Sequence, residues 1–177
     1  MNNMKLSHRP AIESDYENIC GFAQTPEEVF FFCPRGSYPL TPEALQTIIE
    51  KRKDPTIATL EGHPVAFSNF YEWGDHCAIG NLIVAPYARG KGVASYLVNV
   101  MKDIAFSKHN ATEIRLACFN HNTPGLLLYP KLGFQPYAIG ERIDHTGARV
   151  AEILLSTKKP RRRGLRGWLT AFGKNQS

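Results

Sequence analysis

The sequence predicts a mixed α/β domain with a mostly antiparallel central sheet, one parallel strand pair and helices on both faces. Three observations predict it. Apolar stretches separated by tight turns fill residues 55–84, as in an antiparallel meander. Apolar residues at helical spacing follow over 93–108. The next apolar stretch, 113–119, should lie parallel to the strand before this helix, because such a crossover normally connects parallel strands.

The N-terminal part should contain a strand and two helices. A strand is expected over 5–10, followed by a helix over about 15–23. Ser14 is a suitable N-cap, and Glu17 stands three residues later in the capping-box position.

The second helix should start at Pro42, since Thr41 can cap it and proline is tolerated in the first turn. The aromatic and proline-rich stretch 27–40 between the two helices is predicted to be a structured loop.

The remaining elements follow from turn residues and apolar periodicity. Strands are expected at 55–61 and 65–73, joined by a hairpin turn at 62–64, and at 77–84. After the strand at 113–119 we expect a short helix over 124–132 ended by Gly133, then strands at 134–143 and 148–157.

The bulk properties indicate one domain with a basic tail. A chain of 177 residues can form one domain with a proper core. The formal net charge is +5, but seven of the 21 basic residues lie between Lys158 and Lys174. The rest has 14 basic against 16 acidic residues, so its bulk charge gives no reason to bind nucleic acid. We therefore divide the chain into a domain, 1–157, and a C-terminal tail, 158–177.

Neither targeting nor metal binding is indicated. The first ten residues lack the apolar core of a secretory signal, and no apolar run approaches bilayer length, so a cytoplasmic protein is expected. The four cysteines are far apart, which favours reduced core thiols over a zinc site. We expect no metal.

The stretch from Asn81 to Ala94 is the most informative. An apolar strand enters a turn that contains Arg89-Gly90-Lys91-Gly92, and the turn feeds the long helix. The first backbone N–H groups of a helix are unpaired, and its dipole is positive there, so this end suits a phosphate or pyrophosphate. The glycines allow close approach, and the two cations add charge.

Other glycine-rich loops fit less well. A P-loop requires Gly-Lys-Ser/Thr, whereas Gly92 precedes Val93 here. A dinucleotide-binding fingerprint requires an acid at the end of the next strand, and Glu113 opens that strand instead. A solvent-exposed glycine turn is the remaining alternative.

Two motifs resemble the GNAT superfamily of acyl-CoA-dependent N-acetyltransferases. Its Gln/Arg-x-x-Gly-x-Gly/Ala motif is matched by Arg89, Gly92 and Ala94. A second segment is similar to the family's Asn followed seven residues later by Tyr and then by Leu-Gly-Phe, with Gly125 where the family usually has Ala. The resemblance covers residues 5–157. The second segment's matching residues are Asn122, Tyr129, Leu132, Gly133 and Phe134.

The resemblance implies a GNAT-like fold whose parallel strands splay around CoA, with acetyl-CoA as cosubstrate. Pantetheine would pair with the main chain of the strand before the turn, where a backbone N–H could also stabilise the oxyanion. Tyr129 would donate a proton to the leaving thiolate, although a core-facing aromatic is the alternative. Asn122 would contact the cofactor or cap a helix. The implied cofactor-binding residues are Leu82, Ile83, Val84, Arg89, Gly90, Lys91, Gly92, Val93, Ala94, Asn122 and Tyr129.

The implied reaction is transfer of the acetyl group to a primary amine of a small molecule or peptide, by direct attack in a ternary complex. The stretch 27–38 would line the acceptor site, with simple packing as an equal alternative. No spacing singles out the base; water is one candidate, and the side-chain candidates are Glu28, Glu72, Asp75 and His76. The alternative function is a catalytically silent domain that binds or senses acyl-CoA.

The tail carries an apolar helical pattern beside its basic residues. It could contact an anionic membrane surface or RNA, the latter consistent with a ribosome-associated modifier. A solvated tail, or one that docks on its own domain, is the simpler alternative. Homodimer formation is left open. The apolar residues are Leu165, Trp168, Leu169 and Phe172.

Overall fold

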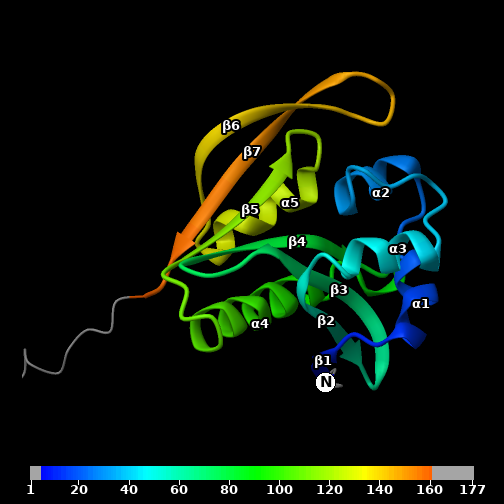
Figure 1. Cartoon of the computed structure of the whole chain (residues 1–177), viewed down its shortest axis with the longest axis horizontal. Helices are drawn as coiled ribbons and strands as arrows, with labels where there is room; N and C mark the ends of the chain where they lie inside the picture. The colour runs from blue at the N-terminus through cyan, green and yellow to red at the C-terminus, as the bar shows by residue number, and fades with distance from the viewer. Residues whose placement is uncertain (1–4, 161–177) are drawn as a thin grey trace, which may run out of the picture.

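A computed structural model of the chain describes residues 5–160, which form one seven-stranded mixed sheet with helices packed against it (Figure 1). The strand order is β1-β2-β3-β4-β5-β7-β6. The strands are β1 (Leu6–Pro10), β2 (Lys53–Leu60), β3 (His63–Glu72), β4 (His76–Val84), β5 (Glu113–Phe119), β6 (Gln135–Ile143) and β7 (Arg149–Lys158). The helices are α1 (Tyr16–Cys20), α2 (Pro26–Phe32), α3 (Pro42–Ile49), α4 (Val93–Ser107) and α5 (Thr123–Leu128), with short 3-10 helices η1 (Glu13–Asp15), η2 (Pro86–Ala88) and η3 (Tyr129–Leu132).

The predicted fold class is confirmed. Strands β1 to β4 form the antiparallel meander, α4 crosses over, and β5 then lies parallel to β4. Strands β5, β7 and β6 complete the sheet with antiparallel pairs. Helix α4 lies across β1 to β4, while α1 to α3 gather near the far ends of β3 and β4 (Figure 1). The apolar stripe of α4 is buried, which fixes this helix against the sheet.

The stretch 27–40 is not the loop that the sequence predicted, because it begins with helix α2. The Thr25 hydroxyl accepts a hydrogen bond from the Glu28 backbone N–H at 3.1 Å, and Pro26 occupies the first turn. Both features favour a helix start, and carboxylates in the first turn complement the helix dipole. The helix buries Phe30 and Phe32.

The predicted cap of the first helix is also wrong. Residues 13–15 form a 3-10 helix, and α1 is only five residues long. The Asp15 carboxylate, not Ser14, accepts the backbone N–H of Ile12 at 2.9 Å and binds both terminal nitrogens of Arg9. Those charge-assisted bonds pull the chain into a tighter turn. The cap of α3 is confirmed, since Thr41 accepts the Ala44 N–H at 3.3 Å.

The parallel pair between β4 and β5 is short. Only three residue pairs join the strands, ending at Ala78 and Arg115, and the strands then separate. A bulge in β4 adds to the divergence: Asn81 has a φ of 50°, and the register with β3 shifts beside it. The edge of β4 that faces β5 therefore has no ladder partner from residue 79 onward within the described chain.

Two further findings concern the described part of the chain. Among residues 5–160, no helix has both the length and the apolar character needed to cross a membrane. In the same range, no three His, Cys, Asp or Glu side chains come close enough together to hold a metal ion. The apolar pattern of the tail and its predicted contacts with membrane or RNA lie outside the described residues.

Candidate active site

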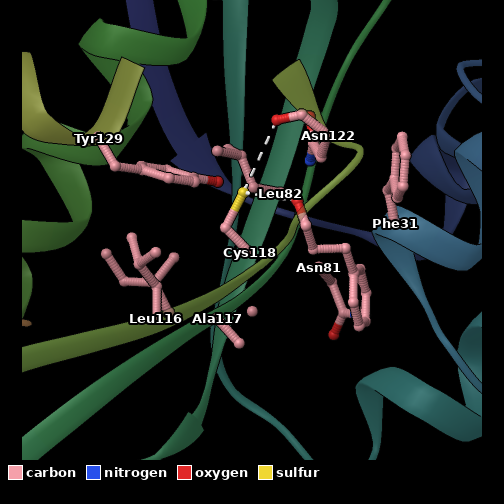
Figure 2. A pocket seen from close by; sticks show the side chains of 11 residues that line it. Phe31, Asn81, Leu82, Leu116, Ala117, Cys118, Asn122 and Tyr129 are labelled. Atoms are coloured by element: carbon pink, nitrogen blue, oxygen red, sulfur yellow. Dashed lines mark hydrogen bonds between the residues drawn. The ribbon is translucent and has the colours of Figure 1, made fainter. Parts of the chain in front are cut away.

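A pocket occupies the opening between the separated ends of β4 and β5 (Figure 2). Figure 2 shows Tyr129 on one side of this opening and Phe31 and Asn81 on the other, with Cys118 between them. Its walls come from α2, β4, β5 and the α5 region, so the fold brings residues from most of the domain together here. The lining residues are Phe31, Ile79, Gly80, Asn81, Leu82, Leu116, Ala117, Cys118, Phe119, Asn122 and Tyr129.

The glycine turn follows β4 after the short 3-10 helix η2 and leads into α4. Gly90 and Gly92 have φ angles of 73° and 78°, and no atom stands within 4 Å of a Cβ built on either. Gly92 is the N-cap of α4, and no side chain caps the helix. The first N–H groups, which include those of Val93 and Ala94, thus lie at an open helix start where an anion can approach. Lys91 is exposed beside them.

The side chain of Arg89 points toward α2 and connects the glycine turn to neighbouring elements by hydrogen bonds. Its guanidinium donates two hydrogen bonds to the Glu28 carboxylate, at 2.6 and 3.1 Å, one to the Phe22 carbonyl at 3.1 Å and one to the Val84 carbonyl at 3.2 Å. The hydrogen bond from Arg89 holds the pKa of Glu28 below its usual value. A carboxylate with a lowered pKa is a weak base, so Glu28 is a poor candidate for deprotonating the acceptor.

We expect Glu28→Gln to lower stability at neutral pH by about 1 kcal/mol or less, since the pair is partly exposed. The pKa of Glu28 is lower in the folded state, so the stabilisation is present above the unfolded value of about 4.3 and disappears as the pH falls through the folded value. Thermal unfolding of both proteins from pH 7 to pH 3 should show the two curves converging. A constant difference across this range would contradict the assignment.

Tyr129 faces the thiol of Cys118 across the pocket (Figure 2). The Tyr129 side chain is 8% exposed, and burial, with a smaller effect from Cys118, raises its pKa well above the usual value. Its hydroxyl therefore stays protonated and can donate. Burial also raises the pKa of Cys118 to about 11, so this thiol is not a nucleophile at neutral pH.

Asn122 caps α5, because its Oδ1 accepts the Gly125 N–H at 3.1 Å. This finding supports the capping alternative and keeps the side chain on the pocket wall. Gly125 stands where the motif described above usually has alanine, and the reason is local. A Cβ at this position would lie 2.9 Å from Cys118 Sγ and 3.1 Å from Asn122 Nδ2. Glycine at 125 is therefore matched to the sulfur at 118.

We expect Gly125→Ala to destabilise the protein by about 1–3 kcal/mol, the usual cost of overpacking a core. Cys118→Ala should recover much of this loss in the double variant, because it removes the atom that the new methyl group meets. Urea unfolding of the two single variants and the double variant measures the coupling. If the changes in unfolding free energy of the two single variants simply add up in the double variant, contact with the Cys118 sulfur is not the reason that position 125 requires glycine.

The other predicted bases lie away from the pocket mouth. The Glu72 carboxylate and the His76 ring are hydrogen-bonded at 2.8 Å where β3 ends and β4 starts, and the Asp75 carbonyl accepts hydrogen bonds from Thr112. This end of β4 is the one joined to β5. None of the three residues lines the pocket between the separated strands.

An aromatic wall closes the α2 side of the opening. We define it as Phe30, Phe31, Phe119 and His121. The ring centroids of Phe30 and Phe119 are 4.4 Å apart, and those of Phe31 and His121 are 4.8 Å apart. Glu27 Oε1 lies 3.8 Å from the Nε2 of His121.

Sequence reasoning missed Asn81, Cys118, Phe119 and His121 as site residues. The polar Gly80-Asn81 step inside an apolar strand was a readable sign of a bulge. The other three follow or end β5, and nothing in the sequence shows that α2 would meet them there.

Comparisons with known proteins agree with this fold. Residues 14–134 match the model of the acetyltransferase (GNAT) family. A curated relative is the thialysine N-epsilon-acetyltransferase of Bos taurus, 24% identical over 132 residues, which are 74% of this chain and 69% of the relative. One solved structure, a ribosomal-protein-alanine N-acetyltransferase from Brucella melitensis, has a TM-score of 0.71 at 14% identity, covering 86% of this chain and 99% of that one. Another, a spermidine N-acetyltransferase from Vibrio cholerae in complex with CoA and spermine, has a TM-score of 0.72 at 17% identity, covering 86% and 95%.

Proposed function

Because this chain belongs to the GNAT family of acetyltransferases, we propose that it transfers the acetyl group of acetyl-CoA to a primary amine by direct attack in a ternary complex. One observation carries the proposal: the unpaired edge of β4 is followed, after η2 and the glycine turn, by the open N-terminus of α4. An extended amide chain ending in a diphosphate fits such a surface, with its amides along the strand and its phosphates at the helix start.

In this proposal the cosubstrate lies along residues 82–84, and its diphosphate lies on residues 90–94. Arg89 acts indirectly by fixing the turn to β4 and α2 through its four hydrogen bonds. Asn122 holds the opposite wall as the cap of α5.

The chemistry follows from the groups at the pocket. The lone pair of the neutral amine attacks the thioester carbonyl carbon, a C–N bond forms and the C–S bond breaks. A backbone N–H of the unpaired β4 edge stabilises the oxyanion, an effect worth about 3 kcal/mol in comparable sites. Tyr129 gives its proton to the departing sulfur, the proton lost by the amine passes to water, and water returns a proton to the Tyr129 oxygen.

A catalytically silent acyl-CoA-binding domain is the second candidate. It is favoured by the pocket lining, which contains no carboxylate or imidazole among the described residues. Such a domain would keep the glycine turn and the open start of α4 and bind acyl-CoA without releasing thiol.

Calorimetry with acetyl-CoA, followed by a thiol-release assay across a panel of amines, tests both candidates. Binding with amine-dependent release supports the transferase. Binding without release for every amine supports the sensor, and no binding of any acyl-CoA rejects both. The cytoplasmic setting belongs to the same proposal and is supported by four cysteines that are free rather than paired in disulfides.

A further inference from the structure

Resting on this function, we infer that the acceptor is a monoamine carried on an apolar body. Its amino group is received by the side-chain oxygen of Asn81, and its body lies against the rings of Phe31 and Phe119. All three residues line the pocket.

The first step concerns the orientation of the Asn81 amide. Its Nδ2 donates to the Phe32 carbonyl at 2.7 Å. A carbonyl can only accept, so this bond fixes which end of the amide is nitrogen and leaves Oδ1 on the other end. Asn81 is 8% exposed, and its Oδ1 has no hydrogen-bond partner within residues 5–160.

An unpartnered buried carbonyl oxygen is costly, at about 1–3 kcal/mol. This free-energy cost falls on a residue whose backbone conformation is also unusual, since Asn81 lies in the β4 bulge with a φ of 50°. Asparagine tolerates this left-handed conformation better than most residues. The bulge thus holds a buried hydrogen-bond acceptor without a partner in a residue that lines the pocket, and an amine N–H is the complementary donor.

A second carboxamide without partners lies on the neighbouring strand. Asn69 on β3 pairs with Gly80 and is fully buried, and neither its Oδ1 nor its Nδ2 has a partner in the described chain. Its Oδ1 would be 3.6 Å from a Cβ at Gly80, which itself lines the pocket. Unsatisfied amide atoms therefore gather on the two strands next to the bulge, which is the expected character of a polar subsite.

The rings of Phe31 and Phe119 indicate the chemical character of the part of the acceptor that carries the amine. The ring centroids of Phe31 and Phe119 are 6.3 Å apart and stacked, and both rings line the pocket. Phenyl faces attract one ammonium weakly, by about 0.5–2 kcal/mol, and bury apolar groups well. A polyamine brings further charges that need carboxylates, and the described lining residues include none. Glu27 is the nearby acid, but it lies next to His121 and does not line the pocket.

Two variants separate acceptor binding from support of the fold. Asn81→Asp keeps a side-chain oxygen and loses the amide N–H that holds Phe32, whereas Asn81→Gly loses both and accepts the positive φ. If Oδ1 receives the amine, kcat/KM for phenethylamine should fall at least about 30-fold in the glycine variant and within about threefold in the aspartate variant. Acetyl-CoA affinity and the melting temperature, measured on both, should change alike. Equal losses of kcat/KM in the two variants would contradict the inference and leave Asn81 with a structural role only, as the hydrogen-bond donor to the Phe32 carbonyl of α2.

The amine panel tests the acceptor class with wild-type protein. Phenethylamine should exceed spermidine in kcat/KM by at least tenfold at saturating acetyl-CoA, and Phe31→Ala should narrow that ratio. A preference for spermidine overturns the inference while leaving the transferase intact. Absence of thiol release with every amine instead removes the proposed function on which the inference rests.

Discussion

Replacing Gly92 with alanine should weaken acetyl-CoA binding about 100-fold, equivalent to nearly 3 kcal/mol. Gly92 has a φ of 78° at the start of α4, and an L-residue there costs about 1–2 kcal/mol in strain. The helix start can relieve the strain only by rotating the peptides whose N–H groups face the ligand. The added methyl group also enters space that is open in the structure. Calorimetric titration with acetyl-CoA measures the effect.

Gly62 offers a matched control for backbone strain. It has a φ of 88°, its Cβ position is equally open, and it lies in the turn between β2 and β3. Gly62→Ala should therefore cost similar stability in urea unfolding and leave the affinity for acetyl-CoA within about twofold. If the two variants bind equally well, the cradle at α4 is not the phosphate site.

Tyr129→Phe should lower kcat about 100-fold while changing the dissociation constant of acetyl-CoA little, which is a typical loss for a general acid. The hydroxyl is directed at the centre of the pocket beside Cys118, and burial holds its pKa far above neutral (Figure 2). The proton is therefore present at every pH at which the protein is normally assayed, so kcat should show no alkaline decline from Tyr129 below pH about 10. Single-turnover kinetics and a pH profile test both statements.

Tyr16→Phe is the corresponding control. The pKa of Tyr16 is also raised, chiefly by burial, and the residue lies on α1 outside the pocket lining. Removal of the Tyr16 hydroxyl should leave kcat unchanged. Turnover of Tyr129→Phe equal to that of Tyr16→Phe would assign the Tyr129 ring to packing alone.

The sequence predicted most of the fold because its signals are local. Alternating apolar residues and tight turns identified the meander, and the apolar stripe of α4 with its preceding glycines identified the crossover. The succession of strand, glycine turn and helix start was predictable for the same reason, since these elements are close together in the chain. The cap at Thr41 is equally local, and it was found.

What sequence reasoning missed depends on contacts between distant residues. The loop predicted for 27–40 was wrong because aromatic and proline content outweighed the cap at Thr25 in the prediction. Two of the three partners of Arg89, Phe22 and Glu28, are more than 60 positions away, so these contacts leave no local pattern in the sequence. The pocket wall opposite Tyr129 likewise depends on α2 meeting the end of β5, a tertiary contact.

The three-residue ladder between β4 and β5 has a mechanical consequence. Within residues 5–160, the sheet is continuous from β1 to β4 and again from β5 to β6, and only this ladder pairs a strand of one block with a strand of the other. A ligand chain lying against the free edge of β4 would add main-chain contacts where the protein supplies none. The bound cosubstrate would then stiffen the connection between the two blocks of the sheet, and this connection would become flexible again once the product departs.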